Sequence, residues 1–556
     1  MTLSLTDELK KLLQGDVSTD PSTLKEYSHD YSIFEVKPQV VVFPKNTDDL
    51  KRLVKFVRER KEKGENISLT GRSAGTDMSG GPLNEGVIAG FTKYFNHIKG
   101  VSCPPDLSGC YVDVEPGVYY RDLEKELVKQ NLMYPSYPAS KDLCAVGGIV
   151  NNNSGGEKTL AYGQTKDWVE RVKMVLEDGE EHEFGPVKED ELKKKMKQKD
   201  FEGEIYRKLF KLIDKNYDAI MAAKPKVSKN STGYLLSEVW NKEKGIFNIA
   251  KLITGAQGTL GLVTEARLRL MPIPKHSRLF VIFSRTLDPV PEIVRMLLKY
   301  KPESIESYDD RTLQVALKFF PALVRMMKGS IISLGLSFIP EALMVLRGGF
   351  PKMVLLVSLT SDDENDLNDR LRAMKTEIKR FPVESRVTRN AAEEEKYWTI
   401  RRRSFSLLHS HLKGKEAEAF VDDVIVDPDK MAEFLPKVNA ILDRYKDKLI
   451  YTIAGHPGNG NFHIIPLADL SDPQTRDIIR TVTEEVYKLT VEYGGSISGE
   501  HNDGLIRTPF LPLMYDQNII KLFAEVKNIF DSQNIFNPRK KVGGDKEYSM
   551  SHMKRA

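Results

Sequence analysis

Cysteine is scarce in this chain, which has only three in 556 residues, Cys103, Cys110 and Cys144. None has the Cys-x-x-Cys spacing of zinc ribbons or iron–sulfur clusters, so we expect no cysteine-ligated metal centre. A low cysteine content fits a reducing compartment best.

An excess of charge of one sign is also missing. The 83 Lys and Arg residues nearly balance the 79 Asp and Glu residues, and a net charge of +4 is not the basic profile of a nucleic-acid-binding protein. The first fifteen residues carry acidic side chains and no apolar run of the signal-peptide kind, and they predict a short amphipathic helix. We therefore expect a cytoplasmic protein with no nucleic acid partner.

The length predicts at least two domains, because one domain usually has about 100–200 residues. Residues 1–275 look like one mixed α/β unit, which begins with an apolar strand at 40–43 and a helix capped at Asn46 or Thr47. Turn signals cluster at 271–274, so we place a domain boundary near 275.

The second domain, 276–520, alternates predicted strands at 353–359 and 449–466 with charged helices. This order favours an antiparallel sheet with helices on one face. We expect the last segment, 521–556, to pack back onto the first domain. The predicted fold class is α+β.

Three glycine-rich segments lie in the first domain: GRSAGTDMSGG at 71–81, GGIVNNNSGG at 147–156 and GAQGTLG at 255–261. Glycine permits positive φ and close approach, so successive backbone N–H groups can surround a pyrophosphate. One such segment alone could be a surface turn. Three in one domain favour a nucleotide cofactor.

Two common nucleotide-binding patterns are missing. A Rossmann fingerprint needs GxGxxG before a helix, but GAQGTLG runs into residues 262–270, where apolar and polar residues alternate with the period of a strand. Neither GxxxxGKS nor GxxxxGKT occurs in the chain. The cofactor must bind to a different fold.

Two histidines, His456 and His463, bracket the segment PGNGN, between apolar runs that predict strands joined by a tight Asn-Gly turn. Both imidazoles could then face one point. Two histidines and a carboxylate form a common open site for a divalent metal, and Glu500 is our candidate for the third ligand. The alternative is a pair of structural histidines bonded to backbone carbonyls.

Eight segments have the order found in a known group of flavoproteins: TGRSAGTDMSGG at 70–81, VDVEPGVYYRDL at 112–123, YPASKDLCAVGGIVNNNSGG at 137–156, YGQTKDWV at 162–169, TGAQGTLGLVTEARL at 254–268, HPGNGNFH at 456–463, GEHNDGL at 499–505 and NPRKKV at 537–542. On these segments the chain resembles the vanillyl-alcohol oxidase and p-cresol methylhydroxylase superfamily, and within it the branch of D-lactate dehydrogenase, glycolate oxidase and D-2-hydroxyglutarate dehydrogenase. The resemblance implies a two-subdomain FAD-binding domain of p-cresol methylhydroxylase type and an α+β cap domain for the substrate.

The resemblance also implies that loop 71–76 wraps the FAD pyrophosphate, while 137–156 and 255–264 flank the ribityl chain and isoalloxazine. The residues expected to bind FAD are Gly71, Arg72, Ser73, Ala74, Gly75, Thr76, Pro138, Gly147, Gly148, Asn151, Asn152, Ser154, Gly155, Gly258, Gly261, Val263 and Asn537. Relatives with covalent flavin often place a histidine in the first loop. Residues 72–77 contain none, so we expect dissociable FAD.

A zinc- or manganese-type ion at His456, His463 and Glu500 is a further implication of the resemblance. Two neighbouring positions depart from the family pattern. Asn459 stands where relatives usually have Asp, and Asn502 where they usually have Gly. These departures leave the identity of the metal open.

The implied substrate, a 2-hydroxy acid, has a carboxylate and a hydroxyl on adjacent carbons, so a divalent ion can chelate both and lower the pKa of the hydroxyl. We assign His501 as the base that takes this proton as hydride leaves for flavin N5, because an unperturbed histidine has a pKa of about 6.5. Arg401, in WTIRRR, is our candidate for holding the substrate carboxylate. At least one of the three arginines should be a solvated residue.

Residues 317–352 form a hydrophobic and basic insertion, in which five basic side chains accompany a single acid, Glu341. The longest uncharged run, 329–340, is shorter than the about 20 residues needed to span a bilayer. The insertion could form core helices, dock a partner subunit, or contact the anionic inner face of a membrane and bring the flavin near quinone.

With no iron–sulfur motif of its own, the chain would need an external electron acceptor: quinone, a separate iron–sulfur protein or an electron-transfer flavoprotein. We predict an FAD-dependent dehydrogenase that oxidises D-lactate, glycolate or D-2-hydroxyglutarate to the 2-oxo acid. Two other classes stay open. One is a non-catalytic flavin-binding subunit of a larger complex, and the other is a metal-dependent hydrolase that needs no flavin.

Overall fold

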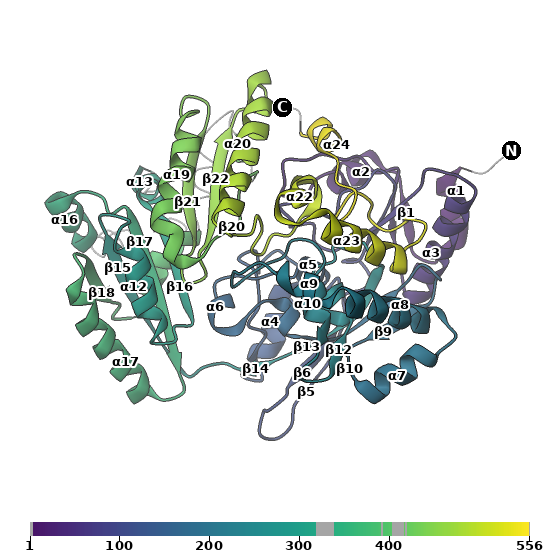
Figure 1. Ribbon diagram of the computed structural model, residues 1–556, viewed down its shortest axis with the longest axis horizontal. Helices are drawn as coiled ribbons and strands as arrows, with labels where there is room; N and C mark the ends of the chain where they lie inside the picture. Colours follow the sequence, from purple (N-terminus) through teal and green to yellow (C-terminus); the bar gives the residue numbers. More distant parts are fainter. Residues whose placement is uncertain (1–3, 319–338, 391–392, 403–415, 418–419, 555–556) are drawn as a thin grey trace.

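The computed structural model describes residues 4–318, 339–390, 393–402, 416–417 and 420–554 (Figure 1). In Figure 1 the first part of the chain lies on the right and the following part forms a separate layer on the left. The last helices, in yellow, return to the right-hand part. The two parts have their own sheets and hydrophobic cores.

The chain begins with a small mixed sheet. Its strands are β1 (Asp16–Ser18), β2 (Val40–Phe43), β4 (Val87–Gly90) and β3 (Leu69–Arg72), in that order, flanked by α1 (Leu5–Leu12), α2 (Pro21–Tyr27) and α3 (Thr47–Glu62). Helix α3 starts after Asn46, whose side-chain oxygen accepts a hydrogen bond from the backbone N–H of Asp49 at 3.0 Å. This cap and the buried face of α3 confirm the predicted strand–helix unit.

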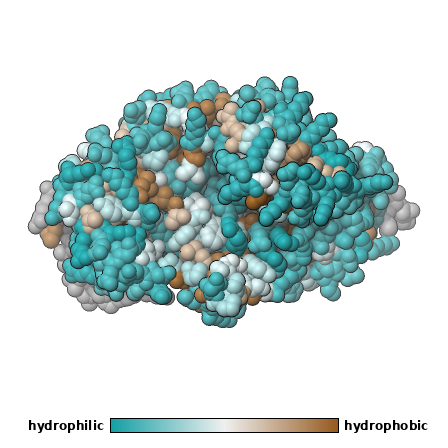
Figure 2. Space-filling view, turned by 60° about the horizontal axis from the view of Figure 1, so that its bottom comes forward, coloured by the Kyte–Doolittle hydropathy of each residue, from teal (hydrophilic) through white to brown (hydrophobic). Residues whose placement is uncertain are grey.

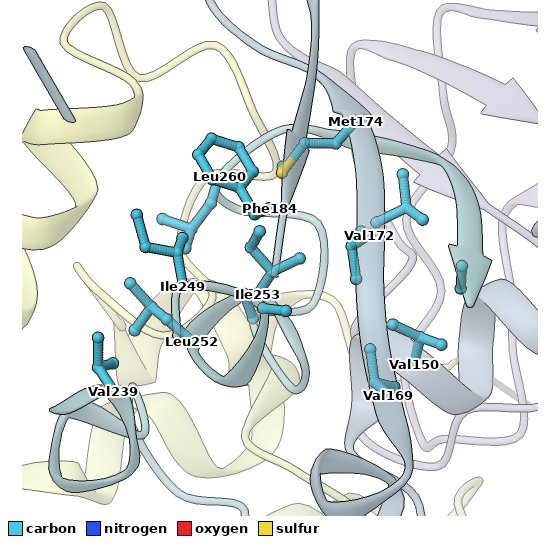
Figure 3. Packing of buried hydrophobic residues seen from close by; sticks show 14 of the residues in the cluster. Val150, Val169, Val172, Met174, Phe184, Val239, Ile249, Leu252, Ile253 and Leu260 are labelled. Carbon is cyan, nitrogen blue, oxygen red and sulfur yellow. The ribbon is translucent and has the colours of Figure 1, made fainter. Parts of the chain in front are cut away.

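A five-stranded antiparallel sheet follows, with β5 (Ile98–Ser102), β6 (Tyr111–Val114), β13 (Leu262–Arg269), β8 (Val169–Val175) and β9 (Glu181–Phe184) in spatial order. The segment after GAQGTLG is therefore a strand, as its alternation predicts. Figure 3 shows Leu252 and Ile253 of α11 (Ala250–Ile253) among the apolar side chains that face β8. The packing fixes the third glycine-rich segment, which connects α11 to β13.

The other elements of this part are short strands and helices: β7 (Leu132–Met133), β10 (Pro186–Lys188), β11 (Trp240–Asn241), β12 (Ile246–Asn248), β14 (Met271–Pro272), α4 (Tyr120–Val128), α5 (Val146–Asn152), α6 (Thr159–Tyr162), α7 (Glu189–Lys197), α8 (Phe201–Lys215), α9 (Tyr217–Ala222) and α10 (Leu236–Val239).

The cap is built on an antiparallel sheet. Among the described residues its strands are β18 (Glu384–Val387), β15 (His276–Ser284), β17 (Met353–Ser361), β16 (Ser304–Asp309), β21 (Ile450–His456), β22 (Asn461–Ala468) and β19 (Glu416–Ala417), with β20 (Val424–Ile425) also paired to β22. Helices α12 (Val290–Leu298), α17 (Glu364–Glu377), α19 (Met431–Asp443) and α20 (Pro473–Glu492) share one hydrophobic core with this sheet. The expected antiparallel sheet is confirmed, but the expectation of helices on one face only is wrong. On the opposite face, Leu313 of α13 (Asp310–Lys318) and Met344 of α16 (Ile339–Gly348) form a second, smaller core with the sheet.

The two faces of the cap sheet have different surroundings. Along β21, Tyr451 and Ile453 belong to the core under the helices, whereas Thr452, Ala454 and His456 line a cavity. Successive side chains of a strand point to opposite faces, so one strand serves both surroundings. The cavity side of the sheet is the side that faces the glycine-rich segments.

The chain ends on the first part of the molecule. Helix α23 (Gln517–Phe530) packs on α8, and its residues Leu522, Val526 and Phe530 belong to the core of that part (Figure 1). Strand β14 pairs with β7, and β15 then begins the cap sheet at His276. We propose domains 1–275 and 276–520 and a returning segment 521–556 on this basis.

The hydrophobic and basic insertion is described only in part. Helix α13 (Asp310–Lys318) and helix α16 (Ile339–Gly348) lie at its two ends, and residues 319–338 lie outside the described residues. Across the described part of the chain, no helix is both long and apolar enough to cross a bilayer. The face in Figure 2 is mostly hydrophilic, with small hydrophobic patches.

Cys103 and Cys110 are joined by a disulfide that closes the loop between β5 and β6. Disulfides are rare in reducing compartments. The bond therefore disagrees with our expectation of a reducing compartment. A low cysteine count does not exclude a disulfide, because two cysteines in one short loop are enough to form it. Cys144 is free and buried.

Candidate active site

One cavity of about 390 Å³ lies between the glycine-rich segments and the cap sheet. From the first domain it is lined by most residues predicted to bind FAD: Gly71, Ser73, Ala74, Gly75, Thr76, Pro138, Gly147, Gly148, Asn151, Asn152, Ser154, Gly155, Gly258, Gly261 and Val263. From the other side come the predicted catalytic and metal-binding residues Arg401, His456, His463, Glu500 and His501. The two sites predicted from opposite halves of the sequence adjoin in one cavity.

Helix α5 forms part of the cavity wall, and its glycines set how closely the backbone approaches. A Cβ on Gly147 would lie 2.4 Å from Oγ of Ser73 and 2.6 Å from Cβ of Pro116, so only glycine lets α5 meet the first loop. A Cβ on Gly148 would meet no atom within 4 Å. The wall therefore presents open backbone, as a pyrophosphate or a flavin ring requires.

Two residues predicted to contact FAD, Arg72 and Asn537, do not line the cavity. The Arg72 guanidinium donates to the backbone oxygen of Tyr27 at 3.2 Å, behind the loop. Asn537 Nδ2 donates to the backbone oxygens of Gly81 at 2.9 Å and Gln257 at 2.6 Å. Arg72 thus connects the first glycine-rich segment to α2, whereas Asn537 joins the first and third glycine-rich segments from behind.

The Nε2 atoms of His456 and His463 lie 3.1 Å apart, and each is 3.3 Å from Oε1 of Glu500. Ligands about 2.0–2.1 Å from a tetrahedral zinc ion are separated by about 3.3–3.4 Å. The three atoms, which we call the ligand triangle, thus have the spacing that one cation can bridge. The histidines reach it from the end of β21 and the start of β22 across the turn at 457–460.

Two buried charges support the ligand triangle. Nδ1 of His456 is hydrogen-bonded to the Glu306 carboxylate, an arrangement that orients metal-ligating histidines in proteins. Burial would lower the pKa of His456, but Glu306 outweighs it and raises that pKa. The ammonium of Lys229, whose side chain is fully buried, lies 2.9 Å from Oε2 of Glu500.

The charge of Glu500 depends on these neighbours. Burial would raise the pKa of the Glu500 carboxyl, but the Lys229 ammonium and His456 hold it well below its usual range. Oε2 is engaged by Lys229 while Oε1 faces the histidines. Glu500 is therefore an ionised carboxylate with one oxygen free for a cation.

His501 lies beside the ligand triangle and is oriented by a buried carboxylate. Its Nδ1 is 2.5 Å from Oδ2 of Asp422, while Arg507 donates to the other oxygen of Asp422 at 2.5 Å. Burial would lower the pKa of His501, but Asp422 and Asp423 outweigh it and raise that pKa to about 9. This value differs from the ordinary histidine pKa on which the assignment as a base was made.

Asp423 fixes the loop that carries Glu500 and His501. Its Oδ2 accepts hydrogen bonds from the backbone N–H groups of Glu500 at 2.8 Å and His501 at 2.6 Å, and from Oγ of Ser498 at 2.7 Å. One carboxylate thus sets the direction of both candidate functional side chains.

Arg401 reaches the cavity from the cap. Its Nη2 lies 3.2 Å from Oε2 of Glu306, and its Nε is buried without a hydrogen-bond partner among the described residues. Buried donors are nearly always paired in proteins, so an unpaired one that borders a cavity suits a ligand acceptor. Arg402 instead pairs with Glu157 at 2.8 Å and is half-exposed.

Both positions that depart from the family pattern have structural partners. Asn459 Nδ2 donates to Oγ of Ser228 at 3.0 Å. Asn502 has φ of +68° and donates to the backbone oxygens of Asn152 at 3.1 Å and Gly255 at 2.9 Å. Neither side chain replaces a member of the ligand triangle.

Sequence reasoning missed Lys229, Glu306 and Asp422. Asp422 had a usable signal, because two adjacent acids inside the apolar run FVDDVIV are costly to bury unless they have charged or hydrogen-bonding partners. Glu306 gave a weaker signal of the same kind, as an acid in the strand SIESYD. Lys229 gave none, since the segment KPKVSKNS has the composition of a solvated loop.

The chain matches two family models. Residues 38–185 match the FAD binding domain, and residues 273–541 match the C-terminal domain of FAD linked oxidases. Among solved structures, p-cresol methylhydroxylase has a TM-score of 0.67 at 16% identity, covering 97% of this chain and 96% of that one. The 4-ethylphenol oxidase from Gulosibacter chungangensis gives the same TM-score and identity over 98% and 97%. These structures support the predicted two-part fold.

Curated relatives have dehydrogenase and oxidase names. D-2-hydroxyglutarate dehydrogenase of Pseudomonas putida is 27% identical over 95% of this chain and 50% of its own length. D-lactate dehydrogenase of Anaerostipes hadrus is 25% identical over 97% of both chains, and the glycolate oxidase protein GlcD of Bacillus subtilis is 25% identical over 93% and 92%. The chain spans about half the length of the Pseudomonas relative. Its two matched domains show that it belongs to the FAD-linked oxidases.

Proposed function

We propose that this protein is an FAD-dependent dehydrogenase that oxidises a 2-hydroxy acid to the 2-oxo acid. The observation that carries the proposal is the single cavity in which the glycine-rich segments meet the ligand triangle and His501. A hydrolase that works without flavin would not need the glycine-lined half of this cavity. A non-catalytic flavin subunit has no use for the buried charges that surround the triangle.

The residues of the cap would bind and orient the substrate. When bound, FAD supplies the acceptor for the hydride from C2, and a divalent cation of zinc or manganese type supplies the charge that polarises the hydroxyl. His456, His463 and Glu500 would hold the cation. Arg401, with its unpaired Nε, would hold the substrate carboxylate in a fixed direction.

His501 would receive the hydroxyl proton at Nε2, because Nδ1 is engaged by Asp422. Asp422 then stabilises the imidazolium that forms. Positive charge at the ligand triangle favours the neutral imidazole that a base requires and opposes the effect of the two aspartates. The hydroxyl proton thus goes to His501, and the hydride leaves C2 with the two electrons of the C2–H bond.

The electrons would leave to an external acceptor, for which quinone, an iron–sulfur protein and an electron-transfer flavoprotein all remain candidates. We propose that FAD is dissociable, since residues 72–77 contain no histidine. A peripheral membrane contact through the insertion at 317–352 stays part of this proposal, and liposome flotation tests it.

The test is anaerobic stopped-flow reduction of the FAD-loaded protein by D- and L-2-hydroxy acids. We expect bleaching of the flavin with wild-type protein. His501→Asn should retain FAD and its visible spectrum but slow bleaching by about 100-fold or more, the usual range for a lost acid–base group. If no 2-hydroxy acid reduces the flavin of a protein that binds FAD, the proposed function is wrong.

A further inference from the structure

One part of the cavity is not used by the proposed chemistry. Beyond the ligand triangle, on the cap side, Thr312, Thr452, Ala454 and Ile465 line the cavity. We call these four residues the side-chain subsite. It lies where the third substituent of a substrate C2 would go, if its carboxylate and hydroxyl are held as proposed above, and the inference below rests on that function.

The register of the cap sheet puts this subsite next to the ligand triangle. Ala454 pairs with His463, and Thr452 pairs with Ile465, across β21 and β22. Because side chains two residues apart share a face, Ala454 and Thr452 continue the row that begins at His456. The subsite therefore begins at Ala454, directly opposite His463 of the triangle, and runs along the sheet.

The subsite is small and uncharged. Ala454 carries only a methyl group, Ile465 is apolar, and the side-chain hydroxyl of Thr312 donates to Oδ1 of Asp309 at 2.6 Å. Asp309 also accepts from the backbone N–H of Ile453 at 3.0 Å, so its carboxylate lies directly behind the subsite. A negative group in the subsite would meet this acid and, among the described residues that line the subsite, no opposite charge.

The permanent cations that border the cavity are already engaged. Among the described residues they are Arg401, which contacts Glu306, and Arg402, which pairs with Glu157. Nε of Arg401 is a buried donor without a partner among the described residues, and one substrate carboxylate would use it. Neither arginine is one of the four residues of the side-chain subsite. A second carboxylate held in the side-chain subsite would be moved out of water with no cation among the four residues that form it, which is costly.

We propose that the substrate is a 2-hydroxy monocarboxylic acid with a short uncharged side chain, and not a 2-hydroxy dicarboxylic acid. The subsite recognises that side chain by contact with Ala454, Thr452 and Ile465. Selectivity comes from the cost of burying a second charge, so dicarboxylic acids of equal length are rejected.

The experiment compares two acids with the same five-carbon chain, 2-hydroxyvalerate and 2-hydroxyglutarate, each as both enantiomers. The FAD-loaded protein is reduced anaerobically, and the rate constant divided by the apparent Kd is compared. We expect the monocarboxylic acid to exceed the dicarboxylic acid by about 100-fold, since a site that leaves a buried charge unpaired discriminates strongly. Equal or faster reduction by 2-hydroxyglutarate overturns the inference while the proposed function stands. Reduction by neither acid, nor by lactate or glycolate, overturns both.

A matched pair of variants tests the location. Thr452→Lys places an ammonium in the subsite, and Thr452→Met adds similar length without charge. We expect Thr452→Lys to raise reduction by 2-hydroxyglutarate at least 10-fold over Thr452→Met and to lower reduction by 2-hydroxyvalerate. The same ratio of the two acids in both variants would place the side chain elsewhere and overturn the assignment. Should Thr452→Lys fail to retain FAD, the wild-type comparison still decides the substrate class.

Discussion

Among single residues, Lys229 and Glu500 form a buried ion pair that sets the charge of the ligand triangle. Their nitrogen and oxygen lie 2.9 Å apart, with 0% and 6% of the side chains exposed. Removing one partner of a buried pair costs about 3–5 kcal/mol, because the other charge loses its compensation. A divalent cation at Oε1 would provide a second source of compensation.

We predict that Lys229→Met lowers the free energy of unfolding of the metal-free protein by about 3 kcal/mol. Added Zn²⁺ or Mn²⁺ should recover more stability in this variant than in wild type, because the cation replaces the missing positive charge. Urea unfolding with and without metal measures both effects. The control is Lys229→Met with Glu500→Gln, which removes both charges and should lose the metal response. An equal metal response in wild type and Lys229→Met would contradict the prediction.

Also among single residues, His182 makes a pH-dependent contribution to the free energy of unfolding. Its Nε2 lies 2.8 Å from Asp178, and Glu202 is also near. Burial would lower the pKa of His182, but Asp178 and Glu202 outweigh it and raise that pKa to about 9. A raised histidine pKa stabilises the fold fully below the unfolded value of about 6.5, and this stability is lost as the pH rises through about 9.

His182→Gln should therefore destabilise the protein most at pH 6, by about 3 kcal/mol, and much less at pH 10. Urea unfolding of wild type and variant across this range measures the difference. The Asp178→Asn variant should show the same trend with a smaller amplitude. A difference that stays constant with pH would show that the histidine acts through packing alone.

At the scale of the element, helix α5 is fitted to the first glycine-rich loop at Gly147 and open at Gly148. Gly147→Ala should destabilise the FAD-free protein by about 1–3 kcal/mol and weaken FAD binding, because the added carbon overlaps Ser73 and Pro116. Gly148→Ala is the matched control in the same helix. It should be neutral or stabilising by up to about 1 kcal/mol in the FAD-free protein, since alanine favours helix. Thermal unfolding of the FAD-free variants would refute this if both shifts had the same sign.

Much of the element scale was accessible from the sequence. The hairpin that carries His456 and His463 is local, so alternation and an Asn-Gly turn were enough to bring two ligands together. The same alternation identified the strand after GAQGTLG. The hydrogen-bond partners of side chains could not be predicted where those partners are distant in the sequence. Arg72 was expected to bind FAD, but its guanidinium donates to the backbone oxygen of Tyr27.

Other residues of the site could not be predicted to meet, because they are far apart in the sequence. Lys229 and Glu500 are 271 residues apart and Glu306 and His456 are 150 apart, so no local pattern joins them. Buried pairs of this kind follow from how the cap and the first domain meet. The position of the cap relative to the first domain was not encoded in any single motif.

At the scale of the whole molecule, Asn537 joins segments from both ends of the chain. Its Oδ1 accepts from Oγ1 of Thr70 at 3.0 Å, and its Nδ2 donates to Gly81 and Gln257. Asn537→Ala leaves three buried polar groups unpaired, so we expect a loss of about 2–4 kcal/mol and at least 10-fold weaker FAD binding. FAD titration by flavin fluorescence and urea unfolding measure the two effects.

The conservative variant for this position is Asn537→Asp, which keeps the acceptor for Thr70 and loses the donor. Its FAD affinity should lie between wild type and Asn537→Ala. Unchanged FAD affinity in Asn537→Ala would mean that the glycine-rich segments hold their shape without the C-terminal segment.

The loop that carries Glu500 and His501 is bonded directly to the glycine-rich segments. Asn502 donates to the backbone of Asn152 and Gly255, and Gln257 accepts from the backbone of Gly504 at 2.8 Å. The wall of the FAD cavity and the loop of the proposed cation site are thus one hydrogen-bonded body. Thermodynamic linkage follows from this connection. If bound FAD changes the affinity for a cation at the proposed site by some factor, a bound cation must change the affinity for FAD by the same factor. Where bound FAD strengthens the binding of a cation at the proposed site, loss of either one would promote loss of the other.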